Sequence, residues 1–433
     1  MLATSWTGRR TVIRLGLLGT ALLLLLTATI ALSAESRSAA ADRRGYGAES
    51  WVTSWSASPQ RAIAGPLATR GLDHRTVRDI IVTSVGGDQL RLELTNLYGA
   101  SPLQIGHLTV AVADPGAAVL PGTMNPVTYR GRASFQIPAG AQIRSDPVAM
   151  RVWPLQELAV SIYLPGQTPV AATFHADAQQ VNWVSAAGDH AADLDAGAFS
   201  TAVPSWYYLS GLVVRSPGAI GTVVAFGDSI TDGVGSDDDA NARWPNDLAR
   251  RLDALGGPTL SVTDAGIGGN RVLASSPSFG ASAEARFGRD ALDQPGVRDI
   301  IVLEGINDIG LSTSRRHPGT AIGAAPIIAG YRQLIARAHA RGLKIFGGTL
   351  LPFAGAVYYT AAGEATREAV NAWIRTSGAF DGVIDFDAAM RDPADPLRLN
   401  PGYDSGDHLH PNDAGYQVMA DAINLDMLLA RHQ

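Results

Sequence analysis

The feature that most constrains the fold is an alternation of short apolar runs with longer stretches of helical spacing, which begins at Gly221. Each apolar run is long enough for one buried strand, and the stretches between them place apolar residues three and four positions apart, as helices do. Strands that alternate with helices form a mostly parallel sheet, because each helix returns the chain to the same edge and covers one face of the sheet. Residues 221–433 are therefore predicted to form an α/β domain whose five strands are TVVAF, LSVTDA, DIIVLEG, KIFGGTLL and GVIDF.

A different pattern fills residues 49–217, where short apolar runs are separated by Pro and Gly. The stretch DQLRLELTN alternates leucine with polar residues, which is the period of a half-buried strand. The stretch DIIVTSVGGD precedes it and ends at Gly86 and Gly87, so the two are expected to pair as a hairpin. Because no long helical stretch interrupts these runs, an antiparallel β-sandwich domain is predicted.

Composition limits the class of protein. A chain of 433 residues exceeds what one hydrophobic core usually organises, which favours two domains. Its 46% hydrophobic and 17% charged residues are typical of globular proteins. The net charge of −6 leaves no basic surface, which argues against nucleic acid as a partner.

Residues 1–41 are expected to be a signal peptide. Three arginines precede an apolar run at 15–32, and Ala39 and Ala41 fit the small-residue pattern of a cleavage site. The stretch GRRTVI also resembles a twin-arginine export signal. Secretion without stable membrane association is predicted, and the alternative is an uncleaved anchor, because the apolar run is just long enough to span a bilayer.

Chemically distinct residues follow the predicted parallel strands. Ser229 follows the first strand, Gly269 lies in the loop after the second, and Asn307 follows the third. Asp407 and His410 stand directly before the last predicted helix. Because ligands of open α/β sheets bind outside the carboxyl ends of the strands, we expect these five residues to converge.

These residue types suit acyl transfer to a serine. A serine hydroxyl is inert near neutral pH, so Ser229 needs a base, for which His410 is the candidate, and Asp407 is placed to orient that base. The reaction also creates an oxyanion that needs hydrogen-bond donors already in place. The predicted donors are the backbone N–H groups of Ser229 and Gly269 and the side-chain amide of Asn307.

A second histidine and a second aspartate compete for these roles. His408 lies two residues from His410, and Asp404 is an alternative to Asp407. Only His410 has an aspartate three residues before it and a proline after it, so His410 is favoured. Pro411 is expected at the first position of the following helix, where it would fix the direction of His410.

Four stretches of the sequence, FGDSIT, GIGGN, GIND and DHLHP, resemble the four blocks of the SGNH hydrolases, also called GDSL lipases and esterases. The blocks supply a serine, a glycine, an asparagine and an Asp-x-x-His pair, which here match Ser229, Gly269, Asn307, Asp407 and His410. The resemblance spans Gly221 to about Leu429 and implies a flavodoxin-like three-layer fold and ester hydrolysis without metal or organic cofactor. The second block often begins with asparagine, where this chain has Asp264. The stretch TSVGGDQLRLELTN is similar to the β domain of a secreted subgroup associated with plant-polysaccharide deacetylation.

The sequence as a whole predicts a secreted serine esterase that removes acyl groups, with acetyl expected, from a small-molecule or polysaccharide ester. The alternatives are a lipase or general carboxylesterase acting on acyl lipids, and a non-catalytic glycan-binding protein. The consecutive acids Asp237–Asp239 suggest either a Ca²⁺ site or a solvated loop, and the loop is favoured. Tryptophans of the β region are expected either in its core or as stacking platforms for sugar rings; they are Trp51, Trp55, Trp153, Trp183 and Trp206.

Overall fold

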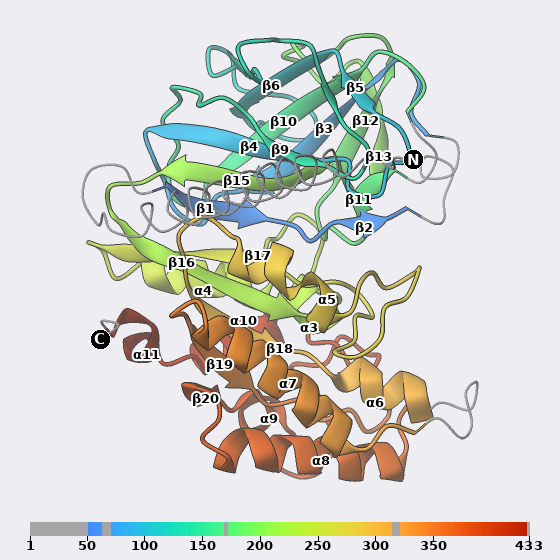
Figure 1. Cartoon of the computed structure of the whole chain (residues 1–433), viewed down its shortest axis with the longest axis vertical. Coiled ribbons are helices and arrows are strands. Elements are labelled where there is room, and N and C mark those ends of the chain that lie inside the picture. Colours follow the sequence, from blue (N-terminus) through green and yellow to red (C-terminus); the bar gives the residue numbers. More distant parts are fainter. Residues whose placement is uncertain (1–50, 63–70, 169–171, 314–320, 431–433) are drawn as a thin grey trace, which may run out of the picture. The chain divides into compact units, whose positions relative to one another are not determined.

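A computed structural model describes residues 51–62, 71–168, 172–313 and 321–430. The predicted signal peptide at 1–41 lies outside the described residues. The described residues fall within one structural unit that begins at Ser50, in which a β-rich first half continues into an α/β second half (Figure 1).

In the first half, every regular element that the structure describes is a strand. The strands are β1 (Trp51–Ser56), β2 (Gln60–Arg61), β3 (Arg75–Val82), β4 (Gln89–Thr95), β5 (Leu103–Ile105), β6 (His107–Val112), β7 (Asn125–Pro126), β8 (Phe135–Ile137), β9 (Gln142–Arg144), β10 (Glu157–Leu164), β11 (Thr173–His175), β12 (Asn182–Ala187), β13 (Phe199–Val203), β14 (Trp206–Tyr207) and β15 (Leu209–Arg215).

These strands form antiparallel sheets, as predicted. The two larger sheets have the strand orders β1-β15-β4-β9 and β13-β12-β3-β10-β6-β7. Smaller sheets have the orders β14-β11-β2 and β5-β8. One hydrophobic core contains residues of both larger sheets, for example Leu92 of β4 and Val160 of β10, which are fully buried. The leucine alternation of β4 therefore marks its buried face.

The hairpin predicted from DIIVTSVGGDQLRLELTN is wrong. Strand β3 pairs with β10 and β12, whereas β4 pairs with β15 and β9, so the two strands lie in different sheets. Gly86 and Gly87 lie where the backbone passes close to other segments: a Cβ on Gly86 would lie 2.6 Å from the Val152 carbonyl oxygen, and one on Gly87 would lie 2.5 Å from that of Arg215. The glycines serve this close approach and not a two-residue turn.

The second half alternates strands and helices. Its elements are β16 (Ala219–Gly227), α3 (Ser229–Asp232), α4 (Trp244–Asp253), β17 (Thr259–Ala265), α5 (Ala283–Phe287), the π-helix η1 (Gly288–Leu292), β18 (Val297–Leu303), α6 (Ile306–Thr313), α7 (Ala324–His339), β19 (Lys344–Gly348), α8 (Ala361–Thr376), β20 (Gly382–Ile384), α9 (Phe386–Met390), α10 (Asp413–Asp421) and α11 (Leu425–Leu429). None of the helices in the described ranges is both long enough and apolar enough to cross a bilayer.

The five strands β16 to β20 form one parallel sheet in the order β17-β16-β18-β19-β20. This confirms the predicted α/β fold and its flavodoxin-like strand order. Helix α4 packs on β17 and α10 packs on α4, whereas α7 packs on β19 and α8 (Figure 1). The central run Val223–Phe226 is fully buried, because β16 has a strand on each side and layers on both faces.

The chain runs from β16 to β17 on one side and then to β18 on the other. The carboxyl end of β16 is therefore the point where the strand order reverses, which is where open α/β sheets bind ligands. Ser229 follows this end directly.

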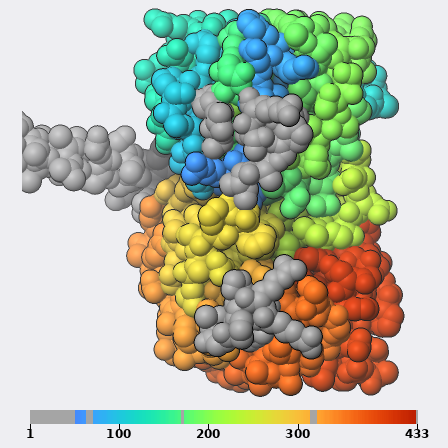
Figure 2. Space-filling model, turned by 90° about the vertical axis from the view of Figure 1, so that its right-hand side faces the viewer, coloured from blue at the N-terminus to red at the C-terminus, as the bar shows by residue number. Residues whose placement is uncertain are grey.

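The two halves are joined through β17 and the loop before β18. The Val262 N–H donates to Ser84 Oγ at 3.1 Å, Ser56 Oγ donates to the Asp264 carbonyl at 2.8 Å, and the Thr53 N–H donates to the Pro295 carbonyl at 3.0 Å. Figure 2 shows the blue surface of the first strands against a yellow surface of the second half, and β1 contacts β17. The predicted domain limits, 49–217 and 221–433, stay predictions.

Candidate active site

Ser229 is held at the carboxyl end of β16 by a tight turn. A Cβ on Gly227 would lie 2.2 Å from Thr231 Oγ1 and 2.3 Å from the Leu303 carbonyl oxygen, so only glycine fits there. The Asp228 side chain caps the short helix α3 by accepting the Ile230 N–H at 3.0 Å. The turn places Ser229 at the start of the helix, at the switch point of the sheet.

The structure brings His410 and Asp407 to Ser229. His410 Nε2 lies 2.8 Å from Ser229 Oγ, and His410 Nδ1 lies 2.5 Å from Asp407 Oδ2. The other oxygen, Asp407 Oδ1, accepts the backbone N–H groups of Leu409 at 2.9 Å and His410 at 2.8 Å. Partial burial opposes ionisation, but these hydrogen bonds keep the pKa of Asp407 well below its ordinary value. An ionised Asp407 accepts a hydrogen bond from the Nδ1–H group of His410, which leaves the lone pair of Nε2 facing the serine hydroxyl.

The competing pair, His408 and Asp404, is separate from this series. His408 Nδ1 lies 2.6 Å from Asp404 Oδ2, and the His408 side chain is 46% exposed against 13% for His410. His408 has a φ of 65°, and its ring lies beside Gly355. The geometry therefore favours His410 over His408 as the base.

The expectation for Pro411 is wrong. Helix α10 begins at Asp413, and Asn412 is its N-cap, with a side chain that accepts the Gly415 N–H at 3.0 Å. Asparagine is among the strongest N-cap residues, which fixes the helix start after the proline. Pro411 instead forms an isolated β-bridge with Asp404, which ties down the segment that carries His410.

Gly269 lies in the loop after β17 with a φ of +70°, a left-handed conformation that favours glycine. A Cβ on this residue would lie 2.3 Å from the ring of Phe279. The neighbouring N–H groups have acceptors: Gly268 donates to Asp232 Oδ2 at 2.9 Å and Asn270 to the Ile267 carbonyl at 3.1 Å. The loop is thus held on both sides of Gly269.

Asn307 lies in the first turn of α6, after β18. The hydroxyl of Tyr358 donates to Asn307 Oδ1 at 3.2 Å, which fixes the orientation of the amide. Asn307 Nδ2 is buried and has no hydrogen-bond partner among the described residues. Because an unpartnered buried N–H is costly, this donor is suited to a group that arrives with a ligand, as an oxyanion would.

A buried arginine holds the carboxyl ends of the two strands that precede the site. Arg286 donates to the carbonyls of Gly227 at 2.7 Å and Ala265 at 2.6 Å, and to Asn270 Oδ1 at 2.9 Å. Its guanidinium also lies over the ring of Phe226, 4.1 Å from the ring centroid. Arg286 therefore fixes the nucleophile turn and the Gly269 loop relative to each other.

Sequence reasoning missed Arg286, Tyr358 and a residue of the β-rich half, His175, which contacts Asp232. Asp232 had a signal, since it follows Ser229 by three residues in the GDSITD stretch. The other three residues had none, because nothing in their local sequence indicates their distant partners.

The remaining candidates have other contacts. Asp239 Oδ1 accepts from Gln180 Nε2 at 2.5 Å and from the Val181 N–H at 2.7 Å, so it fastens its loop to the β-rich half. The described residues hold no group of three side chains that would suit a metal ion. Trp55 and Trp206 are buried in the core, whereas Trp153 is 59% exposed.

The fold and the site together define a class of enzyme. A flavodoxin-like sheet that carries a hydrogen-bonded Ser-His-Asp series at its switch point, with an amide donor, unpartnered among the described residues, in the helix that follows the neighbouring strand β18, is the arrangement of a serine hydrolase that acts on acyl esters. The role of each individual residue stays a prediction.

Residues 225–418 match the GDSL-like Lipase/Acylhydrolase family. This part of the chain is a GDSL-like acylhydrolase domain of the SGNH type, and the chain is a carboxylic ester hydrolase. A comparison with curated proteins found no match.

Similar solved structures include an acetyl xylan esterase from Geobacillus stearothermophilus, with 19% identity over 48% of this chain and 95% of that chain and a TM-score of 0.40. A carbohydrate acetylesterase from Sinorhizobium meliloti has 14% identity over 48% of this chain and 99% of its own, with a TM-score of 0.38. A GDSL-like lipase from Bacteroides thetaiotaomicron has 19% identity over 49% and 89%, with a TM-score of 0.37.

Proposed function

We propose that the chain is a secreted esterase that removes acyl groups, in particular acetyl, from carbohydrates through an acyl-enzyme on Ser229. The observation that carries the proposal is the series Asp407–His410–Ser229, at 2.5 and 2.8 Å, and the buried amide of Asn307 without a partner among the described residues adds support. The similarity of the β-rich half to the β domain of secreted polysaccharide deacetylases supports carbohydrate as the alcohol part, and the predicted signal peptide supports secretion.

The proposed reaction assigns one step to each of these residues. Ser229 Oγ attacks the ester carbonyl carbon while His410 Nε2 takes the hydroxyl proton, and Asp407 stabilises the imidazolium that forms. The carbonyl oxygen becomes an oxyanion, to which the Asn307 amide and the N–H groups of Ser229 and Gly269 donate. Collapse of the intermediate expels the alcohol, which takes the proton from His410, and water then hydrolyses the acyl-enzyme by the same steps.

The test uses the wild type and Ser229→Ala with a series of p-nitrophenyl esters from acetyl to octanoyl, followed by acetate release from acetylated xylan. Ser229→Ala is expected to lower kcat on the order of 10⁴-fold. Removal of the base in His410→Ala should have a similar effect, whereas the matched control His408→Ala should retain activity, because His408 belongs to a separate pair.

The outcomes separate the possible substrates. Activity that falls with acyl length, together with acetate release from xylan, supports the proposal. Activity that rises with acyl length would indicate a lipase, and no Ser229-dependent turnover on any ester would indicate a binding protein. Secretion is tested by N-terminal sequencing of protein from the culture medium, where a start near residue 42 is expected.

A further inference from the structure

A buried histidine makes one of the contacts between the β-rich half and the catalytic loops. His175 is the last residue of β11, and its side chain is 3% exposed. Its Nε2 lies 2.8 Å from Asp232 Oδ1, and its Nδ1 lies 3.0 Å from the carbonyl oxygen of Ser58. Both partners are acceptors, so both ring nitrogens carry a proton and the ring is an imidazolium. Burial lowers the pKa of His175, but Asp232 and the Ser58 carbonyl outweigh this and raise it to about 9.

Asp232 connects this histidine to the loop that carries Gly269. While Asp232 Oδ1 contacts His175, Asp232 Oδ2 accepts the Gly268 N–H at 2.9 Å. The Asp232 backbone also packs on the start of the loop, since a Cβ on Gly266 would lie 2.3 Å from Asp232 N. Asp232 ends the helix that Ser229 begins, so one side chain links the β-rich half, the nucleophile helix and the Gly269 loop.

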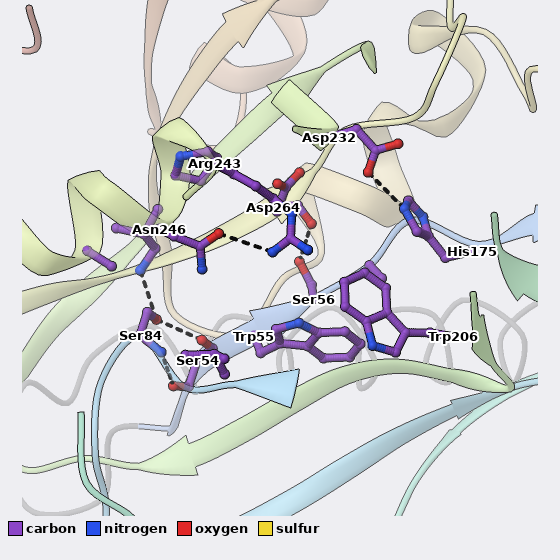
Figure 3. A pocket seen from close by; sticks show the side chains of 15 residues that line it. Ser54, Trp55, Ser56, Ser84, His175, Trp206, Asp232, Arg243, Asn246 and Asp264 are labelled. Carbon is purple, nitrogen blue, oxygen red and sulfur yellow. Dashed lines mark hydrogen bonds and ion pairs between the residues drawn. The ribbon is translucent and has the colours of Figure 1, made fainter. Parts of the chain in front are cut away.

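The cavity beside His175 and Asp232 is too small to hold a substrate. Figure 3 shows the His175 ring pointing at Asp232 beside Trp206, Asp264 and Arg243. These residues line a cavity of about 30 Å³, which has room for a water molecule and not for a sugar. The Trp206 ring lies 5.5 Å from the His175 ring between centroids, so packing also holds the histidine. A sugar substrate therefore does not fit against the pair, and any effect of the pair on the site passes through the loop.

We propose that His175 is a positioning residue for the oxyanion hole: its bond to Asp232 Oδ1 directs Asp232 Oδ2 onto the Gly268 N–H and so sets the direction of the next N–H, that of Gly269. The inference rests on the proposed acyl transfer to Ser229. In this proposal the β-rich half takes part in catalysis, because its His175 supplies the charge that orients a hydrogen-bond donor to the transition state.

Two substitutions at His175 separate hydrogen bonding from packing. His175→Phe keeps a ring against Trp206 but has no N–H for Asp232, whereas His175→Gln keeps an N–H donor without the ring. If His175 positions the loop, His175→Phe lowers kcat for p-nitrophenyl acetate roughly 10-fold with KM within twofold, below the ~100-fold expected when a whole oxyanion donor is lost. His175→Gln should restore most of that loss. If His175 only supports packing, His175→Gln should instead lose more kcat than His175→Phe.

A transition-state analogue gives a second readout. An alkyl boronic acid forms a tetrahedral adduct with the serine, and one of its oxygens occupies the position of the oxyanion. The inhibition constant of the boronic acid should rise in His175→Phe by the same factor by which kcat/KM falls. If His175→Phe does not fold, Asp232→Asn replaces it, because a neutral amide has one acceptor oxygen where the carboxylate uses two.

Ser84→Ala is the matched control. It removes a hydrogen bond between the β-rich half and β17, at Val262, without touching the Gly269 loop. The proposal is overturned if folded His175→Phe and Asp232→Asn keep kcat and boronate binding within twofold of the wild type, or if Ser84→Ala loses as much kcat. Absence of Ser229-dependent turnover in the wild type would instead overturn the proposed function, and this inference with it.

Discussion

Tyr358→Phe tests whether the Asn307 amide acts as an oxyanion donor. The substitution removes the hydroxyl that donates to Asn307 Oδ1 at 3.2 Å. The ring should stay in place, because it packs on Gly310, where a Cβ would lie 2.3 Å from Tyr358 Cδ2. Burial raises the pKa of Tyr358 well above its ordinary value, so the hydroxyl keeps its proton throughout the assay range.

The size of the effect has two bounds. A typical hydrogen bond contributes about 1 kcal/mol, or roughly fivefold in rate. Loss of the complete Asn307 donor would cost about 3 kcal/mol, or roughly 100-fold. We therefore expect Tyr358→Phe to lower kcat by about 5-fold or more but by less than the roughly 100-fold expected for Asn307→Ala.

The assay is a double-mutant cycle on kcat with p-nitrophenyl acetate. If Tyr358 acts only by orienting Asn307, adding Tyr358→Phe to Asn307→Ala produces no further loss. Effects that multiply in the double variant would refute the reasoning, because they would show that the tyrosine acts through another group. The thermal midpoint of each variant is measured alongside to separate rate from stability.

Three further results are expected. Gly269→Ala should lower kcat at least 10-fold, as measured by initial rates, because an alanine at φ +70° is strained and its Cβ would meet Phe279. Asp407→Asn should lower kcat by up to about 10⁴-fold with little change in KM, because a neutral amide no longer stabilises the imidazolium of the base; retention of more than a tenth of the activity would contradict this role. Since the pKa of His175 rises from 6.5 to about 9 on folding, it adds about 3 kcal/mol of stability below pH 6.5 that is lost as the pH rises through 9. Urea unfolding of the wild type and His175→Phe across this range should show a stability difference that shrinks with pH, and a constant difference would show that the ring is not charged.

The parallel sheet was predictable because its strands are buried on both faces. Val223–Phe226 form an uninterrupted apolar run for this reason, and the switch from period-two alternation to such runs separates the two halves. The approach of His410 to Ser229 was predictable because the loops at the carboxyl edge of a parallel sheet meet there, whereas the roles of the site residues stay predictions. Ser229 and His410, 181 residues apart in the chain, accordingly lie within hydrogen-bond distance.

Contacts made by residues without a local pattern were not predictable. His175 and Asp232 are 57 residues apart, and Tyr358 and Asn307 are 51 apart, so no spacing rule relates them. The pairing of β3 with β4 was predicted wrongly for a similar reason. A pair of glycines predicts a turn locally, but at Gly86 and Gly87 the cause is the approach of Val152 and Arg215 from elsewhere in the chain.

The short connection and the contacts between the two halves limit how the domains of this enzyme can be exchanged by protein engineering. Only residues 216–218 separate β15 from β16, and Ser84 and His175 supply partners to groups that belong to the sheet and the catalytic loops. A fragment cut at Gly221 would lack both partners, Ser84 Oγ for the Val262 N–H and His175 for the Asp232 carboxylate. The β-rich half therefore cannot be exchanged freely for another domain. A fusion of the catalytic half to a different β domain would have to replace both partners.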